Sequence, residues 1–132
     1  MAATPQCCMP DKYLDKAIKT DLFDYVLVQF YNNPPCQYDP INSNATLLLQ
    51  SWNAWTSLVL PNNTIFMGLP AAPNAAPSGG YIPPTDLISK VLPFIKPVKL
   101  VIFLFLRFQV IILYSCSLYY HRNHCITILL VL

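Results

Sequence analysis

The sequence predicts an α/β fold in which parallel strands are joined by helices. The first observation is a short apolar run from Tyr25 to Phe30, rich in β-branched and aromatic residues. Such a run is typical of a strand that is buried on both faces. The second observation is the order of patterns along the chain, in which a strand remnant is followed by helix, strand, helix, strand and helix. Alternation of this kind indicates parallel βαβ units.

The central strand should divide its side chains between two faces, because successive residues of a strand point to opposite sides. Gln29 and Tyr31 share one face with Tyr25 and Leu27. A strand that is apolar until its C-terminal end and then presents an amide and a phenol is typical of the catalytic mouth of an α/β barrel. The Asn-Asn-Pro-Pro sequence that follows ends the strand, since neither proline can donate a hydrogen bond to a sheet.

The elements before and after this strand are predicted in order. Residues 1–9 are the strand remnant with its loop. Pro10 suits the first turn of a first helix, with Asp11 near its start and Lys19 near its end, in agreement with the helix dipole. Asp11 and Asp15 would then share a solvated helix surface.

A second helix is expected after Asn42 or Asn44, either of which can cap it. Its apolar face carries, at helical spacing, Leu48, Trp52, Trp55 and Val59. The two tryptophans could form a sugar-stacking pair, but their place on this face favours packing against the outside of the sheet.

A second full strand is predicted from Thr64 to Leu69, ended by Pro70. After a loop of small residues, Pro83 and Pro84 open a third helix. Its apolar side is expected to carry Leu87, Ile88, Val91, Leu92 and Ile95. Pro93 removes one backbone hydrogen bond and should kink this helix.

Composition excludes some classes of function. The 132-residue chain has a formal net charge of +2 and 11% charged residues, so no electrostatic footprint for nucleic acid is expected. All six acidic residues are aspartates, and the chain contains no glutamate. The first residues have no apolar core of a signal peptide. Asn44 and Asn62 each begin a glycosylation tripeptide, a pattern that also arises by chance.

The character of the sequence changes after residue 97. From Leu100 to Leu118 an apolar run is interrupted only by Arg107, Gln109 and two serines, and it is long enough to cross a bilayer. A central arginine costs about 2.5–3.5 kcal/mol on insertion scales, which the surrounding apolar residues offset. Residues 98–132 are therefore interpreted as an apolar tail of unknown origin. Two readings stay open: a membrane segment over 100–118, or non-native sequence such as translated intron.

Several blocks of the chain resemble the plant class III (acidic) endochitinases of glycoside hydrolase family 18, the hevamine-like group. The blocks are VQFYNNPPCQY, then SWNAW, then IFMGLPAAPNAA, in the family's order and within residues 3–96. The resemblance implies that residues 1–97 are part of a catalytic domain, an incomplete (β/α)₈ TIM barrel of about repeats five to seven. It ends before the family's eighth strand, whose active-site tryptophan has no counterpart beyond Trp55 in this chain.

The resemblance also implies site residues. By its QFYNN motif, Tyr31 matches the tyrosine that orients the substrate N-acetyl group, with Gln29 supporting it. Asn32 would contact sugar at the rim, and Asn74 and Ala75 would line the barrel mouth, although the family often has glutamate where this chain has Asn74. The substrate is expected to be chitin or a related N-acetylglucosamine polymer, cleaved with retention in a substrate-assisted reaction, and no cofactor is expected.

The general acid of the family lies in a DGIDFDIE-like block at the end of the fourth strand, which this sequence lacks. Without any glutamate, we expect the chain alone to be inactive. An alternative function is that of a non-catalytic relative, a carbohydrate- or protein-binding protein of the storage or inhibitor type. A membrane-anchored fragment is a second alternative. Oligomers are expected only through aggregation at open sheet edges.

Cysteine use is interpreted through the same resemblance. Cys7 and Cys36 match two family cysteines that pair, closing a loop of about 30 residues, for which a disulfide is worth about 3–4 kcal/mol in the chain-entropy model. Cys8 stands where the family has another residue and is an adjacent competitor. The family is extracellular or vacuolar, whereas in the cytosol all five thiols should stay reduced. A zinc site is not expected, since the spacing of Cys116, His121, His124 and Cys125 fits no common motif.

Overall fold

The computed structural model describes residues 1–58, 63–95, 100–105, 110–116 and 126–131. Its strands are β1 (Ala2–Ala3), β2 (Tyr25–Gln29), β3 (Thr64–Pro70), β4 (Leu100–Phe105), β5 (Val110–Cys116) and β6 (Ile126–Val131). Its helical elements are α1 (Asp15–Ile18), η1 (Pro34–Cys36), α2 (Thr46–Leu58), η2 (Pro73–Ala75), α3 (Pro84–Asp86), η3 (Leu87–Val91) and α4 (Leu92–Ile95).

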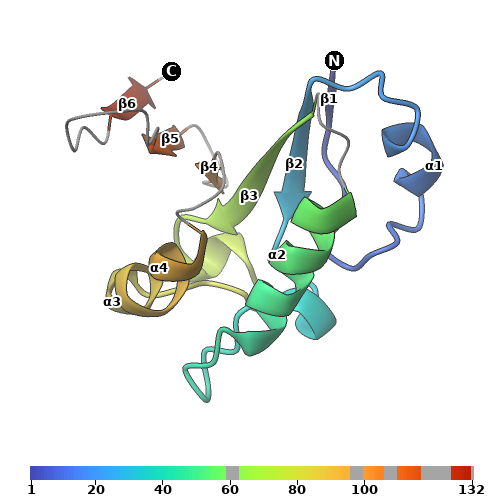
Figure 1. Ribbon diagram of the computed structural model, residues 1–132. Helices are drawn as coiled ribbons and strands as arrows, with labels where there is room; N and C mark the ends of the chain where they lie inside the picture. Colours follow the sequence, from blue (N-terminus) through green and yellow to red (C-terminus); the bar gives the residue numbers. More distant parts are fainter. Residues whose placement is uncertain (59–62, 96–99, 106–109, 117–125, 132) are drawn as a thin grey trace.

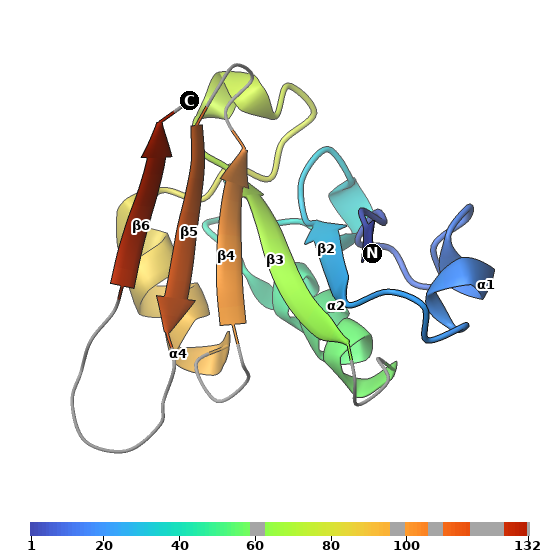
Figure 2. The ribbon, with the colours of Figure 1, turned by 90° about the horizontal axis from the view of Figure 1, so that it is seen from above.

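The described strands form one sheet in the order β1-β2-β3-β4-β5-β6 (Figures 1 and 2). Strands β1 to β4 run parallel to one another, β5 is antiparallel to β4, and β6 is antiparallel to β5. The helices lie in the connections between parallel strands, as the alternation of patterns indicates. The predicted α/β class is therefore confirmed.

Strand β2 has the predicted alternation, but not the predicted burial of both faces. Val26, Val28 and the following Phe30 are fully buried. On the opposite face Tyr25 is 51% exposed and Leu27 is half-buried. The expectation of a strand buried on both faces is therefore wrong for the N-terminal part of β2, because helices of the described chain cover one face more completely than the other.

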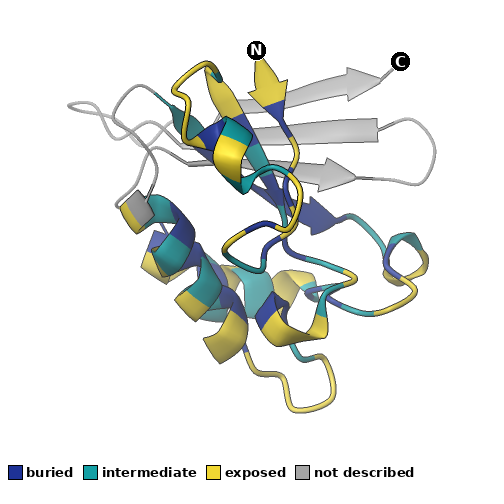
Figure 3. Ribbon diagram, turned by 90° about the vertical axis from the view of Figure 1, so that its right-hand side faces the viewer, coloured by how far each residue is buried: buried dark blue, intermediate teal, exposed yellow. Residues whose placement is uncertain are grey.

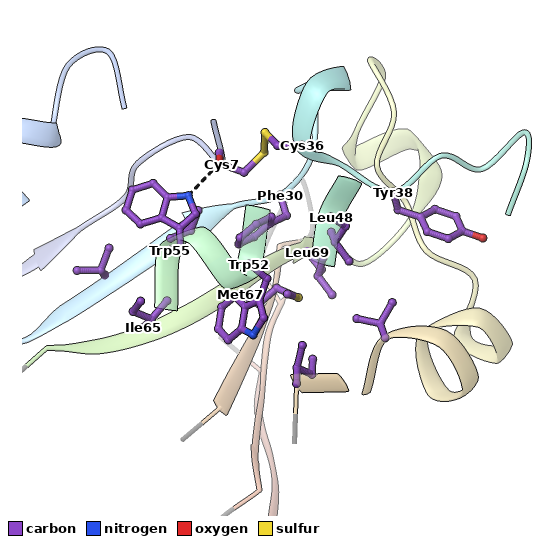
Figure 4. Packing of buried hydrophobic residues seen from close by; sticks show 14 of the residues in the cluster. Cys7, Phe30, Cys36, Tyr38, Leu48, Trp52, Trp55, Ile65, Met67 and Leu69 are labelled. Carbon is purple, nitrogen blue, oxygen red and sulfur yellow. Dashed lines mark hydrogen bonds between the residues drawn. A yellow bond between two sulfur atoms is a disulfide. The ribbon is translucent and has the colours of Figure 1, made fainter. Parts of the chain in front are cut away.

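The main core lies between this covered face and α2 (Figure 4). Leu48, Trp52 and Trp55 of α2 are buried, as their spacing predicts, whereas Val59 lies outside the described residues. The ring of Phe30 meets that of Trp52 edge-on, with 6.0 Å between centroids, an arrangement favoured by the ring quadrupoles. The Asn44 side chain accepts a hydrogen bond from the backbone N–H of Thr46 at 2.8 Å, so the predicted cap is present.

The first helix differs from its prediction. Only Asp15–Ile18 is helical, and Asp11 precedes it. Asp11 is 5% exposed, so its expected place on a solvated helix surface is wrong. Both carboxyl oxygens accept backbone hydrogen bonds, from Gln6 at 2.8 Å and from Tyr13 and Leu14 at 2.8 and 2.6 Å. The carboxylate thus joins the loop after β1 to the turn before α1.

The third helix runs from Pro84 to Ile95 as three consecutive segments. The π-helical segment η3 lies directly before the segment that contains Pro93, where the chain was expected to deviate from regular α-helix. Val91 and Ile95 face the core, whereas Ile88 is 64% exposed and does not belong to the apolar side as predicted. Figure 3 shows the exposed and buried sides of the helices.

Strand β4 pairs in parallel with β3, from Phe66 beside Val101 to Pro70 beside Phe105. The described parts of the apolar run 100–118 are the strands β4 and β5, while residues 106–109 and 117–118 lie outside the described residues. Among the helices that the structure describes, none is both long and apolar enough to span a bilayer. The membrane segment and the boundary at residue 97 stay predictions.

Candidate functional site

Amide side chains gather where β1 and β2 end. Gln6 lies just after β1 and forms an isolated parallel bridge with Gln29, the last residue of β2. The Gln6 side-chain N–H donates to Oε1 of Gln29 at 2.7 Å, and Oε1 of Gln6 accepts a hydrogen bond from Nδ2 of Asn33. Nδ2 of Asn33 also donates to the carbonyl oxygen of Tyr31 at 3.1 Å. The three amide side chains of Gln29, Gln6 and Asn33 are thus linked in series, and Asn33 connects them to the backbone of Tyr31.

Tyr31 lies two residues after the end of β2 at Gln29 and is half-buried. Burial raises the pKa of its phenol above the ordinary value of 10.0. The phenol therefore keeps its proton at neutral pH and can donate a hydrogen bond. A protonated phenol at the carboxyl end of a parallel strand can orient a carbonyl group of a ligand.

The loop after β3 closes on this position at Gly80. Gly80 has φ 100°, a backbone conformation that L side chains rarely adopt. A Cβ built there would lie 2.7 Å from Cα of Tyr31 and 3.1 Å from the carbonyl oxygen of Phe30. Only glycine allows this close approach, so the loop after β3 packs directly on the Tyr31 backbone.

Asn32 joins the same two loops. It has φ 56°, which asparagine tolerates better than most residues. Its backbone N–H donates to the carbonyl oxygen of Gly79 at 2.9 Å, and its Oδ1 accepts from the backbone N–H of Ser78 at 2.9 Å. Gln37, which is buried, adds a hydrogen bond from Nε2 to the Ser78 carbonyl at 3.2 Å. Asn32 is exposed, and its Oδ1 already has a partner within the loops.

Asn74 and Ala75 lie in η2, within the loop that follows β3. Asn74 is exposed and Ala75 is half-buried, and the backbone N–H of Ala75 donates to the carbonyl of Ala72 at 3.0 Å. The carboxyl ends of β2 and β3 are neighbours, with Gln29 beside Gly68. Asn74, Ala75 and Tyr31 thus come from loops at the same sheet edge.

A general acid needs a raised pKa, whereas the pKa is lowered at Asp11, Asp24, Asp39 and Asp86. Burial of Asp11 acts against ionisation, but hydrogen bonds from Leu14, Gln6 and Tyr13 outweigh it and lower the pKa of its carboxyl. Hydrogen bonds also lower the pKa of Asp24, Asp39 and Asp86. Asp24 contacts the chain's amino group at the amino end of β2, the edge opposite Tyr31.

Three sulfur atoms form the one group of metal-capable side chains found among the described residues, namely Cys7, Cys8 and Cys36. The expected disulfide between Cys7 and Cys36 is present, with 5.8 Å between the two Cα atoms (Figure 4). Of the four residues at which a zinc site was considered and not expected, Cys116 lies in β5, and the two histidines and Cys125 are outside the described residues.

The two glycosylation tripeptides stay predictions. Asn44 is exposed, while its side-chain oxygen caps α2. Asn62 lies outside the described residues.

Sequence reasoning missed Gln6, Asn33 and Gly80 as parts of this site. Gln6 could have been found from the sequence. It comes after β1, Gln29 is the last residue of β2, and residues at the carboxyl ends of neighbouring parallel strands lie close together. Gly80 could have been suspected from the Gly-Gly pair, but its contact with Tyr31 depends on the tertiary structure.

No protein-family model matches the chain. A curated relative, the acidic endochitinase of Cucumis sativus, is 59% identical over 96 residues, which are 73% of this chain and 31% of the relative. The solved ICChI chitinase from Ipomoea carnea is 59% identical with a TM-score of 0.67, covering 74% of this chain and 34% of that protein. The resemblance to plant acidic endochitinases is confirmed, and the chain spans about a third of the length of these relatives.

Two further solved structures are not named as enzymes. The xylanase and alpha-amylase inhibitor protein XAIP-II from Scadoxus multiflorus is 40% identical, with a TM-score of 0.66 over 74% of this chain and 34% of its own. The tamarind chitinase-like lectin is also 40% identical, with a TM-score of 0.66 over 78% of this chain and 38% of its own. The fold segment is thus shared by chitinases and by proteins named for binding.

Proposed function

We propose, from the homology of this chain with plant acidic endochitinases, that it carries part of a site for chitin or a related β-1,4-linked N-acetylglucosamine polymer. The observation that carries the proposal is Tyr31, a protonated phenol at the carboxyl end of β2, held by the Gln29–Gln6–Asn33 amides and by the loop at Gly80. A sugar N-acetyl group offers the carbonyl acceptor that such a donor can orient.

The proposal includes the architecture of the parent domain. The parallel strands β1 to β3 correspond to about repeats five to seven of an incomplete (β/α)₈ barrel of glycoside hydrolase family 18. Their carboxyl ends form one edge, which in such barrels holds the active site. Secretion and a role in plant defence would follow from the same kinship.

In the proposed site, Tyr31 donates its phenolic hydrogen to the N-acetyl oxygen and holds that oxygen beneath the anomeric carbon. Gln29 supports it from the same strand face, and Asn32, Asn74 and Ala75 contact sugar at the rim. Cleavage also needs an acid that protonates the leaving oxygen. The chain has no glutamate, and hydrogen bonds lower the pKa of four of its aspartates, so we infer that the 132-residue chain binds sugar without cleaving it.

A second candidate is a binding function without catalysis, of the lectin or inhibitor type. The specific observation in its favour is the likeness to a lectin and an inhibitor protein at 40% identity each. The two candidates differ in the result expected when the acid-bearing block and the eighth strand of a chitinase are added. A protein of the lectin or inhibitor type would then bind the sugar polymer without hydrolysing it.

The test is titration calorimetry of the full chain with a chito-oligosaccharide, alongside hydrolysis of a fluorogenic analogue. Tyr31→Phe should weaken binding about tenfold, the cost of about 1.4 kcal/mol for one hydrogen bond. Tyr13→Phe is the matched control, since Tyr13 is 79% exposed and outside the site. Equal binding by Tyr31→Phe and wild type would refute the role of Tyr31, and hydrolysis by the chain alone would refute the inferred lack of an acid.

A graft distinguishes the two candidates. The acid-bearing block and the eighth strand of the Cucumis sativus relative are joined to residues 1–97. If the site is catalytic in origin, turnover should return, and Tyr31→Phe should then lower kcat more than it raises KM, because the contact strengthens in the transition state. Binding without turnover by the graft favours the lectin-type function.

A further inference from the structure

The disulfide between Cys7 and Cys36 has a third sulfur beside it. Sγ of Cys8 lies 2.9 Å from Sγ of Cys36, and the three sulfur atoms are within 4.8 Å of one another. We call these residues the sulfur cluster. Cys8 is the free cysteine of the cluster, so a thiol is held in contact with one atom of an existing disulfide.

The three cysteines of the cluster differ in how far they are buried. Cys7 and Cys36 are buried, at 0% and 3% exposure, whereas Cys8 is half-buried. The main chain at Cys7 is fixed to two elements, since its N–H donates to Gln29 and its carbonyl accepts from Ser51 and Trp55 at 2.6 and 2.8 Å. The cluster therefore has one thiol that solvent can reach, that of Cys8, and two buried cysteines, Cys7 and Cys36.

We propose that Cys8 is a resident nucleophile that exchanges the Cys7–Cys36 disulfide for a Cys8–Cys36 disulfide. The Cys8 thiol first gives up its proton, since the thiolate is the attacking species. Its sulfur attacks Sγ of Cys36, a new S–S bond forms, and the Cys7–Cys36 bond breaks. The electron pair leaves with Sγ of Cys7, which then takes up a proton. The number of disulfides is unchanged, so the step needs no oxidant or reductant.

Loop closure does not select between the two isomers. The sequence separations are 29 for Cys7–Cys36 and 28 for Cys8–Cys36, so the chain-entropy contribution is almost the same. The structure has the Cys7–Cys36 isomer, which we take as the major form. In that form the free thiol is Cys8, the half-buried residue of the cluster, and it is the position open to small alkylating agents or disulfides.

The exchange is coupled to the candidate site through Gln6. Gln6 directly precedes the cluster and donates to Gln29 while accepting from Asn33. Moving the cross-link by one residue changes how the segment after β1 is tied to Cys36 in η1, the element that follows Asn33. The amide chain that supports the Tyr31 backbone is thus connected to the state of the cluster.

The test maps disulfides in the full oxidised chain, first held at pH 8 in native buffer. Acid stops the exchange, free thiols are blocked with a maleimide in denaturant at low pH, and fragmentation mass spectrometry distinguishes Cys7 from Cys8. We expect a minor Cys8–Cys36 isomer in the wild type, on the order of a few per cent, as for a minor state separated by a few kcal/mol. Prior alkylation of Cys8 with iodoacetamide should remove it.

Two variants make the result decisive. Cys7→Ser should form Cys8–Cys36 as its main disulfide in buffer, whereas Cys8→Ser, the matched control, should retain only Cys7–Cys36. The same Cys7→Ser chain oxidised in guanidinium chloride should also pair Cys36 with Cys116 and Cys125, because only the fold keeps Cys8 in place. The proposal is overturned if wild type at pH 8 contains no Cys8–Cys36 link. It is equally overturned if Cys7→Ser leaves both thiols free in buffer, or pairs identically with and without denaturant.

Discussion

Asp11 offers the sharpest test of the structure, because one carboxylate satisfies three backbone N–H groups at a position that is 5% exposed. Asp11→Ala removes both acceptor oxygens and so the partner of all three N–H groups. Hydrogen bonds to charged groups are worth about 1.5–3 kcal/mol each, and a set sharing one carboxylate is not additive. We expect the free energy of unfolding to fall by on the order of 3 kcal/mol.

Asp11→Asn is the matched variant, since it keeps one acceptor oxygen and should lose on the order of 1–1.5 kcal/mol. Urea unfolding followed by the fluorescence of the buried Trp52 and Trp55 measures both changes. With an m-value of about 1–3 kcal/mol/M, the midpoint of Asp11→Ala should drop by on the order of 1–3 M. An unchanged midpoint for Asp11→Ala would refute the assigned hydrogen bonds.

The same residue predicts a pH dependence. The folded pKa of Asp11 lies below the ordinary value of 3.8, so the folded chain binds fewer protons than the unfolded chain around that pH. Its contribution to stability is complete above the unfolded pKa and is lost as pH falls through the folded pKa. The wild type should therefore lose more stability between pH 6 and pH 3 than Asp11→Asn. Because the other aspartates are common to both chains, equal slopes would contradict the role of Asp11.

The remaining predictions concern the loop after β3 and the tail. Gly80→Ala should lower the unfolding free energy by about 1–3 kcal/mol, since the positive φ and the contact with the Tyr31 backbone cannot both be kept. Thermal unfolding measures this change, and a midpoint equal to that of wild type would be inconsistent with the close approach. Deletion of residues 98–132 should speed amide exchange in β3, because β4 pairs with five residues along it. Unchanged exchange in β3 would show that the pairing does not form in solution.

Local side-chain patterns determined much of this fold. The alternation of Val26 and Val28 with Leu27, the cap at Asn44 and the spacing of Trp52 and Trp55 are properties of short segments, and the structure has each of them. The strand and helix periods set the alternation and the spacing, and the cap is a contact between residues two positions apart. The family blocks around Tyr31 likewise lie within single segments, so the resemblance could be found without a structure.

Only the tertiary structure decided the contacts between distant residues. The burial of Asp11, the meeting of Gln6 with Gln29 and Asn33, and the contact of Cys8 with Cys36 all depend on how β1, β2 and their loops are placed. No period within a segment encodes these meetings. The tail shows the same limit, because an apolar run does not by itself indicate with which strand it pairs, and the membrane segment expected over 100–118 stays a prediction. In the described residues, β4 pairs with the edge of β3 that β2 does not occupy. The backbone N–H and C=O groups along that edge need a partner, and β4 provides it.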